Sequence, residues 1–183
     1  MTAAFRWRHD DDTGAIELVD TPARNRDAAP EYRHVADFSG HARASCAHGL
    51  VVDGEPVALF LGGSGASGVH AHSAVVVRGF VYIAVGNRVA CVRPRPYALV
   101  WSTVVDVATC FGVHHDAAHD ALISHGELEI ARVDDAGGIV WSTPGRDIFT
   151  GAIALHGDCI EAIDFAGTAH RFDYASGFPA RNF

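Results

Sequence analysis

The sequence lacks the closely spaced residues by which many functional sites are found. Its cysteines form no Cys-x-x-Cys pair, so a structural zinc site of that kind is not expected. Gly-x-Ser-x-Gly and His-Glu-x-x-His are also absent, which excludes the local signatures of a serine hydrolase and a zinc protease. We interpret the cysteines as reduced, buried thiols that pack as small apolar side chains. They are Cys46, Cys91, Cys110 and Cys159.

Positive charge and long apolar runs are scarce as well. The chain has 14 Lys and Arg against 22 Asp and Glu, which gives a net charge of −8 at pH 7. Because a nucleic-acid site needs concentrated positive charge, we expect no nucleic-acid partner. No apolar run is long enough to span a membrane, and no apolar signal core follows the N-terminus. We therefore expect no membrane partner and a cytoplasmic location.

Helical periodicity is almost missing, and short β-rich runs separated by Gly, Asn, Asp or Pro take its place. The segment Val-Trp-Ser-Thr at 100–103 returns at 140–143, with similar flanking residues. A period of about 40 residues built from short strands is typical of stacked β-units, as in a propeller. The sequence thus predicts one all-β domain over 1–183, with about four to five antiparallel four-stranded sheets.

The clear repeats lie between residues 73 and 177, where three rounds of strands are predicted. The first round is 73–77, 80–85, 88–92 and 98–103; the second is 108–113, 121–124, 128–133 and 139–143; the third is 149–155, 159–165 and 169–174. Upstream, strands are predicted at 15–19, 32–38, 48–52 and 57–61 and assigned to one or two irregular sheets. The glycine-rich segment 62–68 is interpreted as a flexible connection.

The third round lacks its fourth strand, and the N-terminus offers a replacement. Residues 5–8 place Trp7 where the fourth strands of the other rounds place Trp101 and Trp141. We therefore predict that the N-terminal strand 5–8 completes the last sheet and closes the array, which would remove an open sheet edge.

Residues 73–177 resemble the quinoprotein-type (PQQ-like) β-propeller repeat. That repeat has an apolar strand, Asp, a small-residue turn with Thr-Gly, two apolar residues and Trp. The segment 132–141 follows it well, and 172–177 follows it with Ser in place of Thr. The first copy departs from the pattern, because Arg93 stands at the Asp position and residues 94–96 replace the turn.

The resemblance implies a fold and little chemistry. Quinone-dependent dehydrogenases with this repeat are far longer and carry a calcium site, whereas this sequence has no adjacent cysteine pair and no matching calcium ligands. We expect no quinone and predict no cofactor. In such a repeat the Trp would wedge between neighbouring sheets, while Gly137 and Gly177 would supply the positive φ angles that tight turns need.

A second repeated pattern precedes the first strand of each round. His70-x-x-Ser73, Asp106-x-x-Thr109 and Asp147-x-x-Thr150 occupy equivalent places. In a propeller these residues and the turns between second and third strands share one face near the axis, where convergent polar groups favour a ligand site. The predicted ligand-binding residues are His70, His72, Asn87, Asp106, His125, Glu127, Arg146 and Asp147. Alternatively, the Asp and Thr residues hydrogen-bond the backbone and join one sheet to the next.

These observations leave two functional hypotheses. The leading one is a non-enzymatic binding or protein-interaction module, a monomer or homodimer with a protein or small-ligand partner and no catalytic residue. The alternative is a metal-dependent enzyme or metal-binding protein. His70 and His72 would be weak candidate ligands, supported by Glu127 or Asp106. A second histidine-rich segment, 114–120, is interpreted as a solvated turn on the opposite face.

Overall fold

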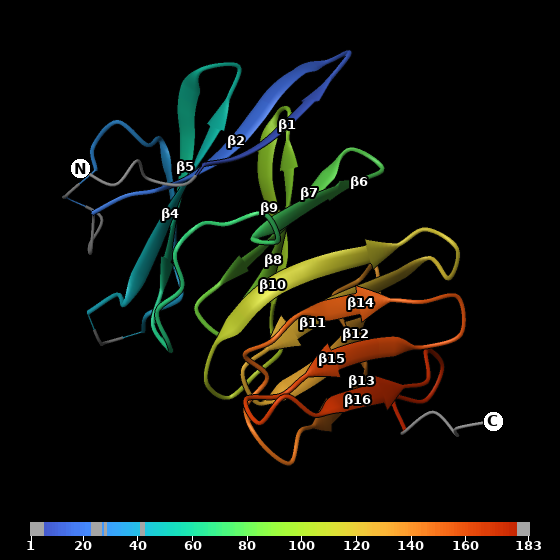
Figure 1. Ribbon diagram of the computed structural model, residues 1–183. Coiled ribbons are helices and arrows are strands. Elements are labelled where there is room, and N and C mark those ends of the chain that lie inside the picture. The colour runs from blue at the N-terminus through green and yellow to red at the C-terminus, as the bar shows by residue number, and fades with distance from the viewer. Residues whose placement is uncertain (1–5, 23–26, 28, 41–42, 179–183) are drawn as a thin grey trace.

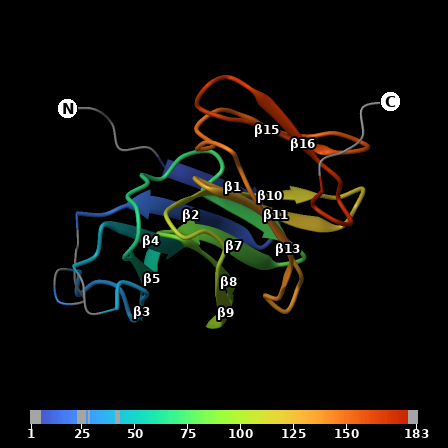
Figure 2. The same ribbon diagram turned by 90° about the horizontal axis from the view of Figure 1, so that it is seen from below.

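A computed structural model describes residues 6–22, 27, 29–40 and 43–178 of the chain. Sixteen strands and no α-helix are found in these residues, and they form four sheets that follow one another along the chain (Figures 1 and 2). No membrane-spanning helix is present in this described part. The all-β, antiparallel architecture predicted from the short strand-like runs is confirmed.

The first sheet has five strands in the order β1-β2-β4-β5-β3. Their bounds are β1 Arg6–Asp11, β2 Gly14–Asp20, β3 His34–Asp37, β4 Cys46–Val52 and β5 Glu55–Gly62. Neighbouring strands are antiparallel except β3, which runs parallel to β5 on the outer edge. The four upstream strands predicted from the sequence are all present, and they belong to one sheet rather than two.

Each later sheet is a meander of consecutive strands. The second sheet contains β6 Ala74–Val77, β7 Phe80–Val85, β8 Arg88–Pro94 and β9 Tyr97–Val104. The third contains β10 Cys110–Asp116, β11 Ala121–Gly126, β12 Glu129–Val133 and β13 Ile139–Pro144. The fourth contains β14 Ile153–Leu155, β15 Ile160–Ile163 and β16 Ala169–Phe172. Every strand predicted between residues 73 and 177 is found, with ends displaced by a few residues.

The predicted closure by the N-terminal strand is wrong. β1 pairs with β2 along its whole length, from Arg6 opposite Val19 to Asp11 opposite Gly14. Trp7 is buried in the core between the first and second sheets. Only a two-residue turn separates β1 from β2, so this pairing closes a far shorter loop than a return to the last sheet. In the described residues the fourth sheet has three strands, and residue 5 of the predicted strand lies outside them.

The repeated tryptophans have the same surroundings in both copies, as the repeat predicts. The indole N–H of Trp101 donates to the Asp135 carbonyl at 2.9 Å, and that of Trp141 donates to the Tyr174 carbonyl at 2.9 Å. Each ring therefore packs on the turn of the following sheet. Gly137 lies beneath one ring with φ +85°, and Gly177 beneath the other with φ +69°.

The hydroxyls that follow each tryptophan repeat their contacts as well. Thr103 Oγ1 donates to the carbonyl of Gly137 at 2.6 Å, and Thr143 Oγ1 donates to that of Gly177 at 2.8 Å. The Trp-Ser-Thr segment and the Gly turn are therefore complementary parts of one contact between consecutive sheets.

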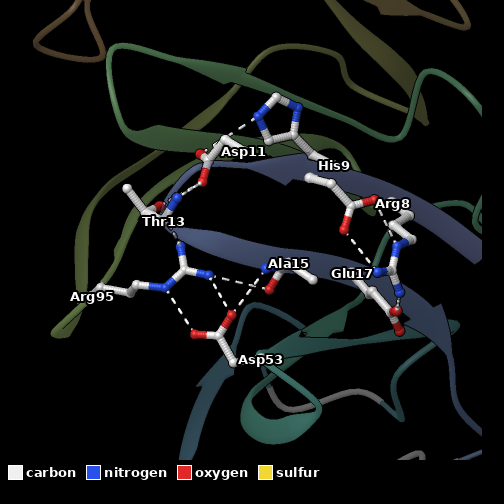
Figure 3. Close-up of polar contacts among 9 residues, drawn as sticks. Arg8, His9, Asp11, Thr13, Ala15, Glu17, Asp53 and Arg95 are labelled. Atoms are coloured by element: carbon white, nitrogen blue, oxygen red, sulfur yellow. Dashed lines mark hydrogen bonds and ion pairs between the residues drawn. The ribbon is translucent and has the colours of Figure 1, made fainter.

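The departure of the first repeat copy has a structural reason. β5, the strand before it, carries no tryptophan, so the turn between β8 and β9 has no indole to hold. Arg95 in that turn reaches back instead and binds Asp53 through Nε at 3.0 Å and Nη2 at 2.9 Å. It also donates to the Ala15 carbonyl at 3.2 Å (Figure 3). A bidentate ion pair thus replaces the aromatic contact between the first two sheets.

Candidate functional site

The loops that lead into the first strand of each later sheet lie against the turns between second and third strands. Cys110 N–H donates to the Gly86 carbonyl at 2.7 Å, and Phe149 N–H donates to the Glu127 carbonyl at 2.7 Å. Phe165 N–H donates to the Ile148 carbonyl at 2.8 Å. These contacts bring the two kinds of loop together at one end of the sheets. We call this end, formed by residues 70–73, 86–87, 105–109, 125–128, 145–150 and 165–168, the loop face.

One cavity, of about 430 Å³, lies beside the first sheet. The cavity that best matches the sequence prediction is a second one, farther along the chain. It has a volume of about 320 Å³. Its walls come from the segments that lead into or form the first strands of the second, third and fourth sheets, and from His125 on β11, the second strand of the third sheet. The lining residues are His70, His72, Phe111, His125, Thr150, Gly151, Ala152 and Ile153. We call it the histidine pocket.

His70 lines this pocket, but both nitrogens of its ring make contacts within the fold. Its Nε2 lies 2.6 Å from the Phe111 carbonyl, which can only accept, so Nε2 carries the proton. Its Nδ1 accepts the His72 N–H at 3.2 Å. Both ring nitrogens are thus occupied, and the imidazole fixes the turn before β6 against the third sheet. No lone pair of His70 is left for a ligand or a metal.

Three further imidazoles lie close together at the pocket. The ring centroids of His72 and His114 are 4.6 Å apart, and those of His114 and His125 are 6.3 Å apart. The Nε2 atoms of His114 and His125 are both buried without a hydrogen-bond partner among the described residues. Unsatisfied buried polar atoms cost stability, so their presence beside a cavity indicates a place where a ligand can supply the missing bond.

The electrostatics of this cluster favour uncharged imidazoles. Burial, with the neighbouring His72, lowers the pKa of His114 to about 3. Burial and the same neighbour lower the pKa of His125 to about 4. The pKa of His72 is lowered too, through burial and His70. At neutral pH the pocket therefore offers neutral nitrogens that can donate or accept, beside the apolar surfaces of Phe111 and Ile153.

The structure separates the other predicted site residues from this pocket. Asp106 is 2% exposed, and its carboxylate accepts the N–H groups of Ala108 at 2.6 Å and of Leu128 and Glu129 at 2.8 Å. This is the structural alternative considered for the repeated Asp. Glu127 contributes backbone bonds to the loop face and does not line the pocket, and the Asn87 carbonyl accepts the Val105 N–H at 3.0 Å.

Arg146 and Asp147 lie at a different cavity, of about 750 Å³, along the fourth sheet. Its walls include His170 and Arg171 of β16. Asp147 is exposed and accepts only its neighbour's N–H, that of Ile148 at 2.8 Å, among the contacts found in the described chain. The eight predicted residues are therefore divided, and only His70, His72 and His125 line one pocket.

The residues present do not form a metal centre. Among the described residues, no group of three or more His, Cys, Asp or Glu side chains is arranged to hold a metal ion. Of the two candidate ligands, His70 already uses both nitrogens, and neither Glu127 nor Asp106 lines the pocket with His72. This chemistry gives no support to the metal-dependent hypothesis at His70 and His72.

The interpretation of segment 114–120 as a solvated turn is wrong for most of its residues. β10 continues to Asp116, and the His114 ring lies against that of His72, which lines the histidine pocket, with centroids 4.6 Å apart. His119 stacks on Tyr174 of the fourth sheet with ring centroids 3.8 Å apart, and the Tyr174 hydroxyl donates to Asp116. The strand alternation that puts His114 on the face of Gly112 was the signal available in the sequence.

Comparison with known proteins shows similarity of fold only. Searches against descriptions of protein families and against curated proteins find no match. Among solved structures, BamB from Moraxella catarrhalis superposes with a TM-score of 0.57 at 12% sequence identity, over 95% of this chain and 47% of BamB. The chain thus spans about half the length of that protein.

Two other solved structures match less closely. BBS1N, from a crystal structure of its complex with ARL6DN, has a TM-score of 0.49 at 13% identity, over 90% of this chain and 49% of that one. Myxococcus xanthus glutaminyl cyclase has a TM-score of 0.39 at 9% identity, over 94% of this chain and 74% of that protein.

The fold is β-propeller-like. The histidine pocket lies between the loops that precede β6 and β14 and the strands β10, β11 and β14.

Proposed function

We propose that this chain is a binding module that captures a side chain of a protein partner in the histidine pocket. The observation that carries the proposal is the buried Nε2 atom of His125, which has no hydrogen-bond partner among the described residues and belongs to a residue that lines the cavity. The Nε2 atom of His114, whose ring lies next to that of His125, is unpartnered in the same way. A ligand that donates or accepts one hydrogen bond there would remove the free-energy cost of a buried nitrogen without a hydrogen bond, which the unbound protein carries.

The size and surface of the pocket favour an uncharged aromatic side chain with a polar end. A cavity of about 320 Å³ accommodates one such ring. The Phe111 and His125 rings stand edge to face, with centroids 6.0 Å apart, and leave aromatic surface for a third ring. Because both imidazoles are neutral at pH 7, a phenol hydroxyl is a better match than a carboxylate.

The loop face supports a protein as the source of that side chain. Val107 and Phe165 lie on this face, outside the lining of the histidine pocket, and are 69% and 72% exposed. Exposed apolar side chains are typical of surfaces that bind other proteins, where one anchor fills a pocket. Rigid sheets also hold the loops of this face in place, which lowers the entropy cost of binding.

A titration with 4-methylphenol, the side-chain analogue of tyrosine, tests the pocket. We expect saturable shifts of the His125 and Ile153 NMR signals, and their loss in Thr150→Arg, which fills the cavity. Ala154→Arg is the matched control, because Ala154 is exposed on β14, four residues after Thr150, and does not line the pocket. Equal shifts in Thr150→Arg and wild type, or no shifts at all, would contradict the proposal.

The protein partner requires a second experiment in the native host. A partner retained by the wild-type chain and by Ala154→Arg, but lost with Thr150→Arg, supports the binding module. A set of retained proteins that is the same for all three chains would rule out the pocket as the docking site.

A further inference from the structure

A second group of reactive side chains lies in the first sheet, away from the histidine pocket. Cys46 and His48 are two residues apart on β4, so strand alternation places both on one face. Asp20, the last residue of β2, is directly opposite His48 in the antiparallel register. A thiol, an imidazole and a carboxylate are therefore aligned on two neighbouring strands.

The three groups are of the types that serve as a nucleophile, a base and a positioning carboxylate, and they lie on adjacent strands. His48 is 0% exposed, and its Nδ1 lies 3.2 Å from Asp20 Oδ1. Neither ring nitrogen makes a well-aligned hydrogen bond with another described residue. Asp20 is itself held in place, because both of its carboxylate oxygens lie 3.0 Å from the Val69 N–H.

Cys46 lines a cavity of about 430 Å³. Cys46 is 4% exposed, so the opening admits a small group rather than a bulky one. Gly62 lies opposite Cys46 on β5. A Cβ added at residue 62 would come within 2.6 Å of the Cys46 sulfur and 2.7 Å of the Gly86 nitrogen, so only glycine fits beside the thiol. The cavity walls are Asp20, Thr21, Pro22, Ser45, Cys46, Ala47, Ala66, Ser67 and Gly68.

The glycine-rich segment interpreted as a flexible connection forms one wall of this cavity. Ser45 Oγ donates to the carbonyl of Gly63 at 3.1 Å, and Gly65 packs against the Thr109 side chain. The segment is thus held against the first sheet and against the loop before β10, and its small residues line the cavity beside Cys46.

The electrostatics distinguish Cys46 from the other thiols. Burial opposes ionisation, but contacts with His48 and with the N–H groups of Gly86 and Ser67 lower the pKa of Cys46 below its ordinary value. Burial likewise disfavours the charged imidazole, yet Asp20 and Cys46 raise the pKa of His48 to about 8. By contrast, burial raises the pKa of Cys91 to about 11 and that of Cys110 to about 12.

We propose that Cys46, His48 and Asp20 form a nucleophilic thiol site that transfers the acyl group of a small ester or thioester held in the adjoining cavity. Cys46 is the catalytic nucleophile, His48 is the acid and base, and Asp20 is a positioning residue that orients the imidazole. The activity is independent of partner binding in the histidine pocket.

The reaction balances with water as the second reactant. The Cys46 sulfur forms a bond to the carbonyl carbon, and the carbonyl electron pair moves onto oxygen. As the carbonyl re-forms, the bond to the alkoxy or thio leaving group breaks with its electrons, and His48 gives that group its proton. Water then attacks the acyl-Cys46 thioester while His48 takes one proton, which releases the acid and restores the thiolate and the imidazolium.

The test uses 4-nitrophenyl acetate with the full chain. We expect a burst of one nitrophenolate per chain, with the acetyl group on Cys46 in peptide mass spectra and not on the other three cysteines. Cys46→Ala should abolish the burst, whereas Cys91→Ala, which removes another buried thiol outside this site, should retain it. Acetylation spread equally over the cysteines, or absent from Cys46, would overturn the proposal.

The pH profile separates catalysis from a merely structural role. In the wild type the burst rate should rise with a midpoint below about 8.5, the value of a free thiol. His48→Asn should slow the burst by about 100-fold or more, and Asp20→Asn should move the midpoint upward. A wild-type midpoint at or above that of a free thiol would overturn the assignment without reliance on any variant. Because Thr150→Arg leaves this cavity untouched, failure of the binding proposal would not affect the result.

Discussion

At the scale of single residues, the turn glycines show how tightly the repeat constrains its sequence. Gly177 has φ +69°, and a Cβ there would lie 2.5 Å from the Trp141 ring. Gly167 has φ +82° with nothing within 4 Å, and Gly157 has open space and no positive φ. A Cβ would meet both backbone strain and a steric clash at Gly177, backbone strain alone at Gly167, and neither at Gly157.

Substitution of the three glycines by alanine should therefore produce a graded loss of stability. We expect Gly177→Ala to cost about 2–4 kcal/mol, from strain and overpacking together. Gly167→Ala should cost about 1–2 kcal/mol from strain alone, and Gly157→Ala should stay within about 0.5 kcal/mol. Urea unfolding gives the three values, and equal losses at Gly177 and Gly157 would show that the Trp141 contact is unimportant.

The buried imidazoles make a prediction about acid. Unfolded histidine titrates near pH 6.5, whereas burial holds the pKa of His114 at about 3 and that of His125 at about 4. The unfolded state therefore binds protons first as the pH falls below 6.5. Each histidine should remove up to about 1.4 kcal/mol of stability per pH unit between pH 6.5 and 5.

Urea unfolding at pH 7, 6 and 5 measures this slope. His125→Gln should reduce it by about half, because the amide does not titrate. His156→Gln is a control on a turn of the fourth sheet, outside the histidine pocket. A stability that stays constant from pH 7 to pH 5 would mean that neither imidazole is buried in its neutral form.

At the scale of elements, β1 belongs to the first sheet, and its removal should affect that sheet. Deletion of residues 1–11 takes away the strand paired with β2 and the buried Trp7. We expect a loss of about 3 kcal/mol or more, with faster amide exchange in β2 and β4 and unchanged exchange in β14–β16. Faster exchange confined to β14–β16 would instead support the prediction that the N-terminal strand pairs with the last sheet. Trp7→Ala in the full chain should give a smaller loss in the same strands.

Asp106 and Asp147, which occupy equivalent positions in the repeat, should contribute differently to the stability of the fold. The buried Asp106 carboxylate accepts three N–H groups, whereas the exposed Asp147 accepts one from its neighbour. Asp106→Asn should cost about 2–4 kcal/mol, because an amide cannot satisfy all three donors. Asp147→Asn, the matched control, should change stability by less than about 0.5 kcal/mol. Thermal or urea unfolding compares them, and similar losses would contradict the joining role of Asp106.

At the scale of the whole molecule, the strands were predictable and some of their pairings were not. Alternation, turn residues and the Trp repeat act locally, so they locate β6–β16 and the Trp141 contact from sequence alone. The partner of β1 depends on a comparison of loop lengths and burial that no local pattern contains. Trp7 was misleading because a tryptophan suits the core between the first two sheets as well as an outer strand.

The residues of the candidate sites were likewise predictable where the repeat located them and not predictable where strand pairing did. His70, His72 and His125 were predictable because the repeat locates the loop face. His114 was missed because β10 runs three residues beyond its predicted end. Cys46 and His48 were missed because the first sheet has no second copy in the chain to which it could be aligned. Asp20 meets His48 only through the β2–β4 register.

The parallel strand β3 has a consequence for the order in which the molecule assembles. Residues 34–37 emerge during synthesis before residues 55–62, the strand beside which they lie. Until β5 has been made, β3 lacks its neighbouring strand, and the apolar surface of Ala47, Leu59 and Leu61 that its flanking residues cover does not yet exist. The first sheet is therefore the earliest to begin and cannot be finished hairpin by hairpin, whereas each later sheet can grow in step with the ribosome.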